Sequence, residues 1–265
     1  MKKKLYKAAN KNRQSCLQTN IMLWPDRILF FGPLQRLSLH SISSLCINVG
    51  IYQPFLAGTE KGVQTPYRAC VIPAGCRHNL SANGNLIASL VIENTATGFF
   101  STGNRLSHNP TSITQLPGIE WTKCFRYIYE ERPSREIITQ LINSLPGIEE
   151  SSVSTLDPRI QAALDAINLS PSDNHGLEIL ASSVGLSASR FRHLFQEQTN
   201  IPLRRYKQWR RVVSAMRSLN NVDNLTHAAM RSGFTDSSHF SRCFRDTFGV
   251  SPSLVFKNLD RFEVY

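Results

Sequence analysis

The sequence lacks the features of secreted and membrane-spanning proteins. Its basic opening segment, MKKKLYKAANKNR, has no apolar run behind it, whereas a signal peptide needs an apolar core of roughly 7 to 15 residues. No stretch approaches the ~18 to 20 continuous apolar residues of a membrane span. We therefore expect a cytoplasmic protein without a membrane partner.

Cysteine pairs are also lacking, because no CxxC occurs among the six cysteines. In a chain of this size without a secretion signal, scattered cysteines are typical of reduced, structural thiols. Cys70 and Cys76 are close enough in sequence for a redox pair, which is kept as an alternative.

Positive charge is present in excess. The chain has 265 residues and a formal net charge of +11, spread over both halves of the sequence. This length favours two domains. The charge favours a polyanionic partner, with nucleic acid first and an anionic membrane surface second.

The pattern along the chain divides it into a β-rich part and a helical part. From Ile28 to about Phe100, short apolar runs are broken by Gly, Pro and Asn, which is typical of strands. Residues 67–72 alternate as one strand that enters a tight turn at residues 73–75. Two amphipathic helices in residues 118–145 either cover the core or form a dimer interface. We expect domains at residues 1–145 and 159–265, joined by a small, polar and acidic linker at 146–158.

Beyond Pro158 the pattern predicts helices throughout. The expected ranges are 159–168, 177–184, 188–198, 202–219, 225–232 and 236–247.

An internal repeat occurs within this helical part. In each copy a short helix ends at a glycine, Gly185 or Gly233, where a left-handed turn residue is needed. An apolar residue and a hydroxyl follow, and we expect Ser187 and Thr235 to cap the next helix at about 1 kcal/mol each. Each copy is therefore predicted to be a helix-turn-helix.

The second helix of each copy has an apolar face and a polar face. Phe191, Leu194 and Phe195 recur at i, i+3 and i+4, and so do Phe240, Cys243 and Phe244. The opposite faces carry Ser189, Arg192, His193 and Gln196 in the first copy, and Ser237, Ser238, Ser241, Arg242 and Arg245 in the second. Arginine and serine side chains fit base edges, and two such helices favour DNA reading over a merely solvated face.

The long helix between the copies has a cationic first half. Its basic residues are Arg204, Arg205, Lys207, Arg210 and Arg211. Its 18 expected positions span about 27 Å, close to the roughly 34 Å between major-groove entries on one face of DNA. One chain could thus place two reading helices in successive grooves, with cations on the phosphates.

Residues 158–257 resemble the AraC/XylS family of bacterial transcription regulators. The resemblance rests on GLSASRFRHLF, YKQWRRVVSAM and GFTDSSHFSRCFRDTFGVSP. It implies base contacts from Ser189, Arg192, His193, Ser237, Ser238 and Arg242. Arg190, Arg211 and Arg245 are then phosphate-contacting or structural positions, and Arg204, Arg205 and Lys207 join them as phosphate contacts.

Three positions depart from the family pattern. Asn200 stands where Gly is common, although Asn tolerates the same backbone conformation. Ala228 replaces a larger aliphatic residue, and Ser189 stands where a bulky reader is common. The family's target sequences are therefore not transferable to this chain.

The N-terminal part resembles the family's sensor domain more loosely. PYRACVIPAGCRHNL looks like the strand, turn and histidine of a degenerate cupin-type barrel that holds a small effector and dimerises. His78 is a weak ligand candidate, and a lone histidine after a turn is more often structural. Cupin metal sites need several His and a Glu, and no HxH occurs, so we expect neither a metal nor a cofactor.

We therefore expect an α+β protein that regulates transcription and is not an enzyme. It would bind double-stranded DNA, respond to a small effector, contact RNA polymerase and act as an activator, although repression stays open. Residues 118–145 are the candidate homodimer surface. One alternative is control by a partner protein or by oxidation of Cys70 or Cys76. Enzymatic alternatives are a DNA-repair alkyl transferase using Cys16 near Lys11 and Arg13, and a cupin oxygenase.

Overall fold

Short runs rich in β-branched and aromatic residues form the strands of the N-terminal part, as their composition predicts. The computed structural model describes residues 17–60, 62–93, 112–146, 156–173, 175–199, 201–219, 225–257 and 259–265. The strands are β1 (Thr19–Leu23), β2 (Arg27–Pro33), β3 (Arg36–His40), β4 (Ser44–Gly50), β5 (Phe55–Thr59), β6 (Thr65–Tyr67), β7 (Ala69–Ile72), β8 (His78–Ser81), β9 (Leu86–Glu93), β10 (Thr114–Gln115) and β11 (Leu259–Val264).

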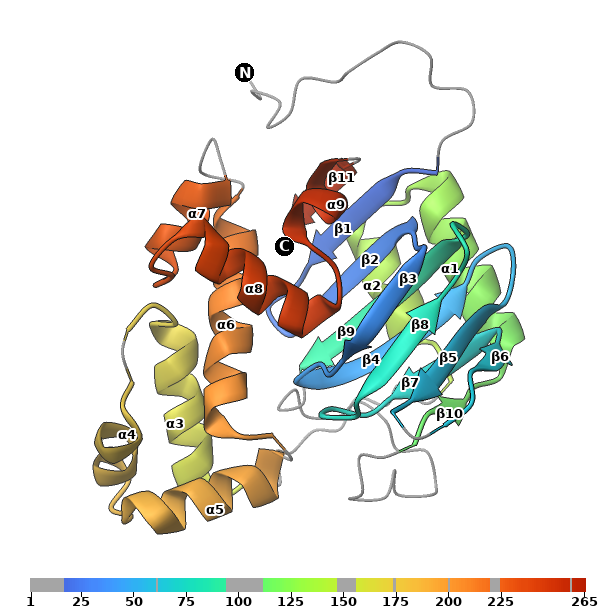
Figure 1. Ribbon diagram of the computed structural model, residues 1–265. Helices are drawn as coiled ribbons and strands as arrows, with labels where there is room; N and C mark the ends of the chain where they lie inside the picture. Colours follow the sequence, from blue (N-terminus) through green and yellow to red (C-terminus); the bar gives the residue numbers. More distant parts are fainter. Residues whose placement is uncertain are drawn as a thin grey trace.

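The strands form two sheets. The larger has the order β10-β7-β4-β9-β2-β1-β11, and the smaller has the order β3-β8-β5-β6. Neighbouring strands are antiparallel, except that β11 runs parallel to β1. Figure 1 shows the small sheet in front of the large one and two helices behind it.

Helices α1 (Gly118–Glu131) and α2 (Arg135–Asn143) cover the outer face of the large sheet. The buried face of α1 carries Trp121, Phe125 and Ile128, which join the same apolar cluster as Phe31 of β2. The sequence left core cover and a dimer interface open, and the structure confirms core cover.

The remaining helices lie in the C-terminal part, and all but the last match a predicted range to within one residue at each end. They are α3 (Pro158–Leu169), α4 (Leu177–Ser183), α5 (Ala188–Thr199), α6 (Leu203–Ser218), α7 (Leu225–Arg231), α8 (Ser237–Phe248) and α9 (Pro252–Lys257). The expectation of helix throughout this part is wrong at its end, because β11 follows α9. Its residues extend the edge of the N-terminal sheet beside β1.

The expectation of one strand over residues 67–72 is also wrong. The segment forms β6 in the small sheet and β7 in the large sheet, and the chain crosses between the sheets at Arg68. The Arg68 guanidinium donates to the carbonyl oxygens of Ile51 and Tyr52, at 3.0 and 2.9 Å. The turn that follows is confirmed, because the Cys76 amide donates to the Pro73 carbonyl and Gly75 has φ of 80°.

The apolar interior couples the second helix-turn-helix to the β-domain. Phe240, Phe244 and Trp209 belong to the same cluster as Ile21 and Leu80 from the inner faces of the two sheets. The first helix-turn-helix has a cluster of its own, which contains mainly residues of α3 to α6 and includes Phe191 and Phe195. The β-domain therefore holds α8 more directly than α5.

Several sequence features lie outside the described residues. They are the basic opening segment, Cys16, Asn200 and residues 147–155 of the expected linker. Among the helices that the structure does describe, none is long and apolar enough to cross a membrane.

Candidate nucleic-acid interface and interdomain cavity

The turn of the first helix-turn-helix follows its sequence closely. Gly185 has φ of 69°, and the Leu186 amide returns to the Ala181 carbonyl at 2.9 Å. The Ser187 hydroxyl accepts from the Arg190 amide at 3.3 Å, which confirms Ser187 as the cap of α5. This cap fixes where α5 begins and therefore which side chains face outward.

The turn of the second copy is tighter. Gly233 has φ of 83°, and a Cβ there would lie 2.8 Å from the Ser172 carbonyl oxygen. The expectation that Thr235 caps α8 is wrong, because Asp236 accepts from the His239 amide at 2.7 Å. Thr235 instead bonds to the Asp236 carboxylate at 3.1 Å. A carboxylate caps a helix N-terminus well because it also interacts with the helix dipole.

The six predicted base-reading residues lie on the outward faces of α5 and α8, and all six are exposed. They are Ser189, Arg192 and His193 on α5, and Ser237, Ser238 and Arg242 on α8. Their base contacts stay a prediction.

A cleft of about 680 Å³ joins the two reading helices. Arg192 of α5 and Arg242 of α8 line it together with three cations of α6, which are Arg204, Lys207 and Arg211. Asp246 is the single carboxylate of this lining. We call this surface the recognition cleft. The sequence identified these cations as DNA-contacting candidates, but it did not indicate that they line a single cleft.

Three of the predicted phosphate-contacting cations also hold protein backbone or side-chain groups. Arg211 donates to the carbonyls of Pro171 and Asp173, at 3.1 and 3.3 Å, and Lys207 donates to the His175 carbonyl. Arg205 donates to the hydroxyl of Ser41 in the β-domain at 2.7 Å. Arg190, Arg204 and Arg245 are exposed. Phosphate contact by any of the six stays a prediction.

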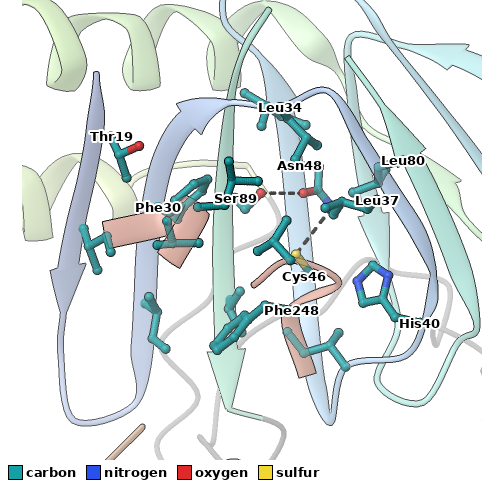
Figure 2. A pocket seen from close by; sticks show the side chains of 18 of the residues that line it. Thr19, Phe30, Leu34, Leu37, His40, Cys46, Asn48, Leu80, Ser89 and Phe248 are labelled. Carbon is teal, nitrogen blue, oxygen red and sulfur yellow. Dashed lines mark hydrogen bonds between the residues drawn. The ribbon is translucent and has the colours of Figure 1, made fainter. Parts of the chain in front are cut away.

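An interior cavity of about 120 Å³ lies between the two sheets and the C-terminal helices (Figure 2). The two sheets supply most of its lining residues, and the majority of these are apolar. The C-terminal part closes it with Met216, Phe244, Phe248, Val250, Leu254 and Val255. Phe244 and Phe248 belong to α8, so the core face of a reading helix is also a cavity wall.

Polar groups at the cavity are largely engaged with one another. Ser89 donates to the Asn48 side-chain oxygen at 2.7 Å, and the Asn48 amide contacts the Cys46 sulfur at 3.4 Å. Figure 2 shows this chain of three in the middle of the wall, with His40 to one side. A ligand there meets an apolar surface with few free polar groups.

The rings of His40 and His78 lie against each other at the cavity, with centroids 4.3 Å apart and planes tilted by 55°. His78 is 2% exposed, and burial together with His40 lowers its pKa from 6.5 to about 4. Burial also lowers the pKa of His40. Both rings are therefore neutral at pH 7. Their Nδ1 atoms lie 2.9 Å from carbonyl oxygens of Cys76 and Ser38, so Nδ1 carries the proton and Nε2 is the acceptor.

Polar contacts also tie the long helix α6 to the β-domain. Glu93, the last residue of β9, accepts from the Tyr206 hydroxyl and from Arg210, both at 2.7 Å. Both partners of the ion pair are buried, with side chains 8% and 11% exposed. Glu93, Tyr206 and Arg210 thus join α6 to the end of β9. No local sequence signal indicated this connection, because Glu93 is more than 110 residues from both Tyr206 and Arg210.

The cysteines are poorly suited to thiolate chemistry. Cys46, Cys70, Cys76, Cys124 and Cys243, the cysteines that the structure describes, are free. Burial raises the pKa of the Cys76 thiol, and burial and Cys46 raise that of Cys70. Because the thiolate is the reactive form, nothing in this geometry favours redox control at these positions.

The helical part of the chain is similar to known DNA-binding domains. Residues 180–258 match a family model described as a helix-turn-helix domain. The activator RhaR of Mannheimia succiniciproducens is 30% identical over 96 residues, which are 36% of this chain and 35% of RhaR. The C-terminal part is an AraC/XylS-type domain.

A second relative extends the likeness. The arabinose operon regulatory protein of Salmonella typhimurium is 30% identical over 128 residues, which are 47% of this chain and 46% of that protein. The chain thus spans less than half the length of these relatives.

Solved structures show the same fold over most of the chain. An apo form of a ToxT variant from Vibrio cholerae has a TM-score of 0.62 at 12% identity, covering 89% of this chain and 98% of ToxT. Wild-type ToxT bound to an unsaturated fatty acid has a TM-score of 0.57, covering 88% and 96%. The predicted α+β fold, a β-rich cupin-like domain with a double helix-turn-helix domain, is confirmed.

Proposed function

We propose that this protein is a sequence-specific DNA-binding transcriptional regulator whose β-rich domain senses a small molecule. The observation that supports this most is the recognition cleft, which gathers cations between two exposed reading helices. The 16 residues of α6 span about 24 Å, and α5 and α8 both pack against this helix. The two reading helices would enter successive major grooves on one face of DNA, which lie roughly 34 Å apart.

The six exposed residues of α5 and α8 would read base edges. Arg192 and Arg242 can each bond guanine O6 and N7 together, and the serines and His193 add single bonds. Arg190, Arg204 and Arg245 would contact phosphates directly. Arg205, Lys207 and Arg211 would combine structural bonds with phosphate contact, since guanidinium and ammonium groups have several donors.

The effector would occupy the cavity between the sheets and α8. A cavity of about 120 Å³ is close to the size of an engineered cavity that holds benzene, so it suits one ring or a short alkyl group. A longer molecule would have to displace residues of α8 or α9. Because α8 is a reading helix, occupancy would then change how the protein binds DNA.

His78 remains the ligand-binding candidate among the polar cavity residues. Its neutral ring presents Nε2 as an acceptor, so a hydroxyl or protonated carboxyl on an apolar effector would be its partner. Solved structures of ToxT bind a fatty acid and a naphthyl butenoic acid, which are apolar bodies with one polar end.

The division of the chain and its macromolecular partners complete the proposal. The sensing and dimerisation domain would be residues 1–145, the linker 146–158 and the DNA-binding domain 159–265. Strand β11, at the end of the DNA-binding domain, pairs with β1 of the sensing domain. The exposed apolar side chains Ile119, Tyr127 and Ile137 of α1 and α2 would form the homodimer surface. Activation through RNA polymerase follows the activators among the relatives, and no catalytic step is assigned.

Genome-wide mapping of binding sites with the full chain, followed by affinity measurement, tests this function. Arg242→Ala should weaken binding to a mapped site by roughly 1 to 3 kcal/mol and leave binding to random DNA nearly unchanged. Arg231, an exposed arginine of α7, gives a matched control, and Arg231→Ala should not alter the preference. Equal loss on mapped and random DNA would reject base reading by Arg242.

A further inference from the structure

A second groove, of about 650 Å³, lies where the β-domain meets the DNA-binding domain. The β-domain lines it with the polar segment around Ser38–Ser43 and with Arg77, which precedes β8. The other wall consists of Arg204, Arg205 and Gln208 of α6 and Arg245, Asp246 and Thr247 of α8. Four arginines from three parts of the chain thus face one groove, which we call the boundary groove.

The charges in the boundary groove are incompletely neutralised. Asp246 is the single carboxylate of the lining. Within the described part of the chain, neither Arg204 nor Arg245 forms an ion pair. Arg77 pairs with Glu60 at 2.9 Å, but both side chains are about half exposed. Such a surface pair is worth at most about 1 kcal/mol, so Arg77 can turn toward an anion at little cost.

The boundary groove is continuous with the recognition cleft. Arg204, Gln208 and Asp246 line both hollows. A nucleic-acid backbone that follows the cleft between α5 and α8 therefore meets the groove at these residues. This continuity favours the phosphates of the bound duplex over a separate small anion.

We propose that the DNA-binding surface extends across the domain boundary and that Arg77 of the β-domain contacts a DNA phosphate. This inference rests on the proposed DNA-binding function and adds a contact outside the helix-turn-helix domain. His40 lines both the boundary groove and the interior cavity. The boundary groove and the effector cavity of the β-domain thus share His40 as a lining residue. An effector that shifts the β-domain would therefore also move Arg77 relative to the DNA and change the number of phosphate contacts.

The salt dependence of affinity tests the proposal on a mapped duplex with flanking sequence on both sides. Each phosphate contact contributes about 0.9 to the slope of log affinity against log salt. Arg77→Ala should lower this slope by about 0.9, so its deficit against wild type shrinks roughly 3.5-fold between 50 and 200 mM salt. Arg77→Lys should keep most of the slope. Glu60→Gln, which frees Arg77, should bind DNA more tightly than wild type.

Arg36, at the end of strand β3 opposite to His40, provides a matched control. Arg36 is exposed, lies outside the groove lining and has the same charge, so Arg36→Ala should leave the slope unchanged. Circular dichroism of each variant confirms folding. An unchanged slope for Arg77→Ala together with unchanged affinity for Glu60→Gln, with wild type binding DNA normally, would overturn the Arg77 contact alone. Saturable binding of inorganic pyrophosphate that requires Arg77, without any slope change on DNA, would also overturn it. Wild type that binds no mapped duplex would instead reject the proposed function.

Discussion

The two turn glycines should differ in how strongly they resist substitution. Both have positive φ, 69° at Gly185 and 83° at Gly233, so alanine at either position costs about 1 to 2 kcal/mol of backbone strain. A Cβ at Gly185 meets nothing within 4 Å, whereas at Gly233 it lies 2.8 Å from the Ser172 carbonyl oxygen. Forcing backbone to shift costs a further 1 to 3 kcal/mol or so.

We therefore expect Gly233→Ala to lower the free energy of unfolding by about 2 to 5 kcal/mol and Gly185→Ala by about 1 to 2. Urea unfolding followed by circular dichroism measures both, and unchanged m-values identify a change in stability. Gly185→Asn should cost less than Gly185→Ala, because asparagine tolerates the left-handed region. Equal destabilisation by the two alanine variants would refute the role assigned to the Ser172 contact.

Two further predictions concern the interior of the molecule. The pKa of His78 is lower in the folded protein than in the unfolded chain, so its contribution to stability is lost as pH falls from about 6.5 to about 4, by up to about 3 kcal/mol. Urea unfolding measured at several pH values should show this loss, and His78→Phe should reduce it. An unchanged pH profile in that variant would reject the assignment to His78. Glu93→Gln leaves the buried Arg210 without its carboxylate and should lower the free energy of unfolding by about 3 kcal/mol or more. The double variant Glu93→Gln/Arg210→Met should recover part of this loss in the same urea assay. Strictly additive losses would show that the two residues do not interact.

Local sequence signals predicted the helix-turn-helix repeats well because their determinants lie within a few residues. Gly185 and Gly233 have positive φ, as their positions before an apolar residue and a cap require. Phe191, Phe195, Phe240 and Phe244 are buried, and the outward serines and arginines are exposed except for the half-buried Ser241. The wrong cap of α8 reflects two adjacent polar residues, Thr235 and Asp236, either of which fits the cap position.

Contacts between distant segments could not be predicted in the same way. Strand β11 forms only because β1 offers a free sheet edge, and Tyr265 then packs on Trp24 at 4.7 Å. The buried pair of Glu93 and Arg210 depends on how α6 docks against the end of β9. Closure of the cavity by Phe244 and Phe248 likewise depends on tertiary packing, since the same residues look like ordinary core positions in the sequence.

The central claim is that one chain reads two successive major grooves through α5 and α8. Hydroxyl-radical and methylation-interference footprints of the full chain on a mapped site test it most directly. We expect two groups of contacted bases about 10 to 10.5 base pairs apart, with Arg192→Ala removing contacts in one group and Arg242→Ala in the other. A single contacted group, or loss of the same bases in both variants, would contradict the account.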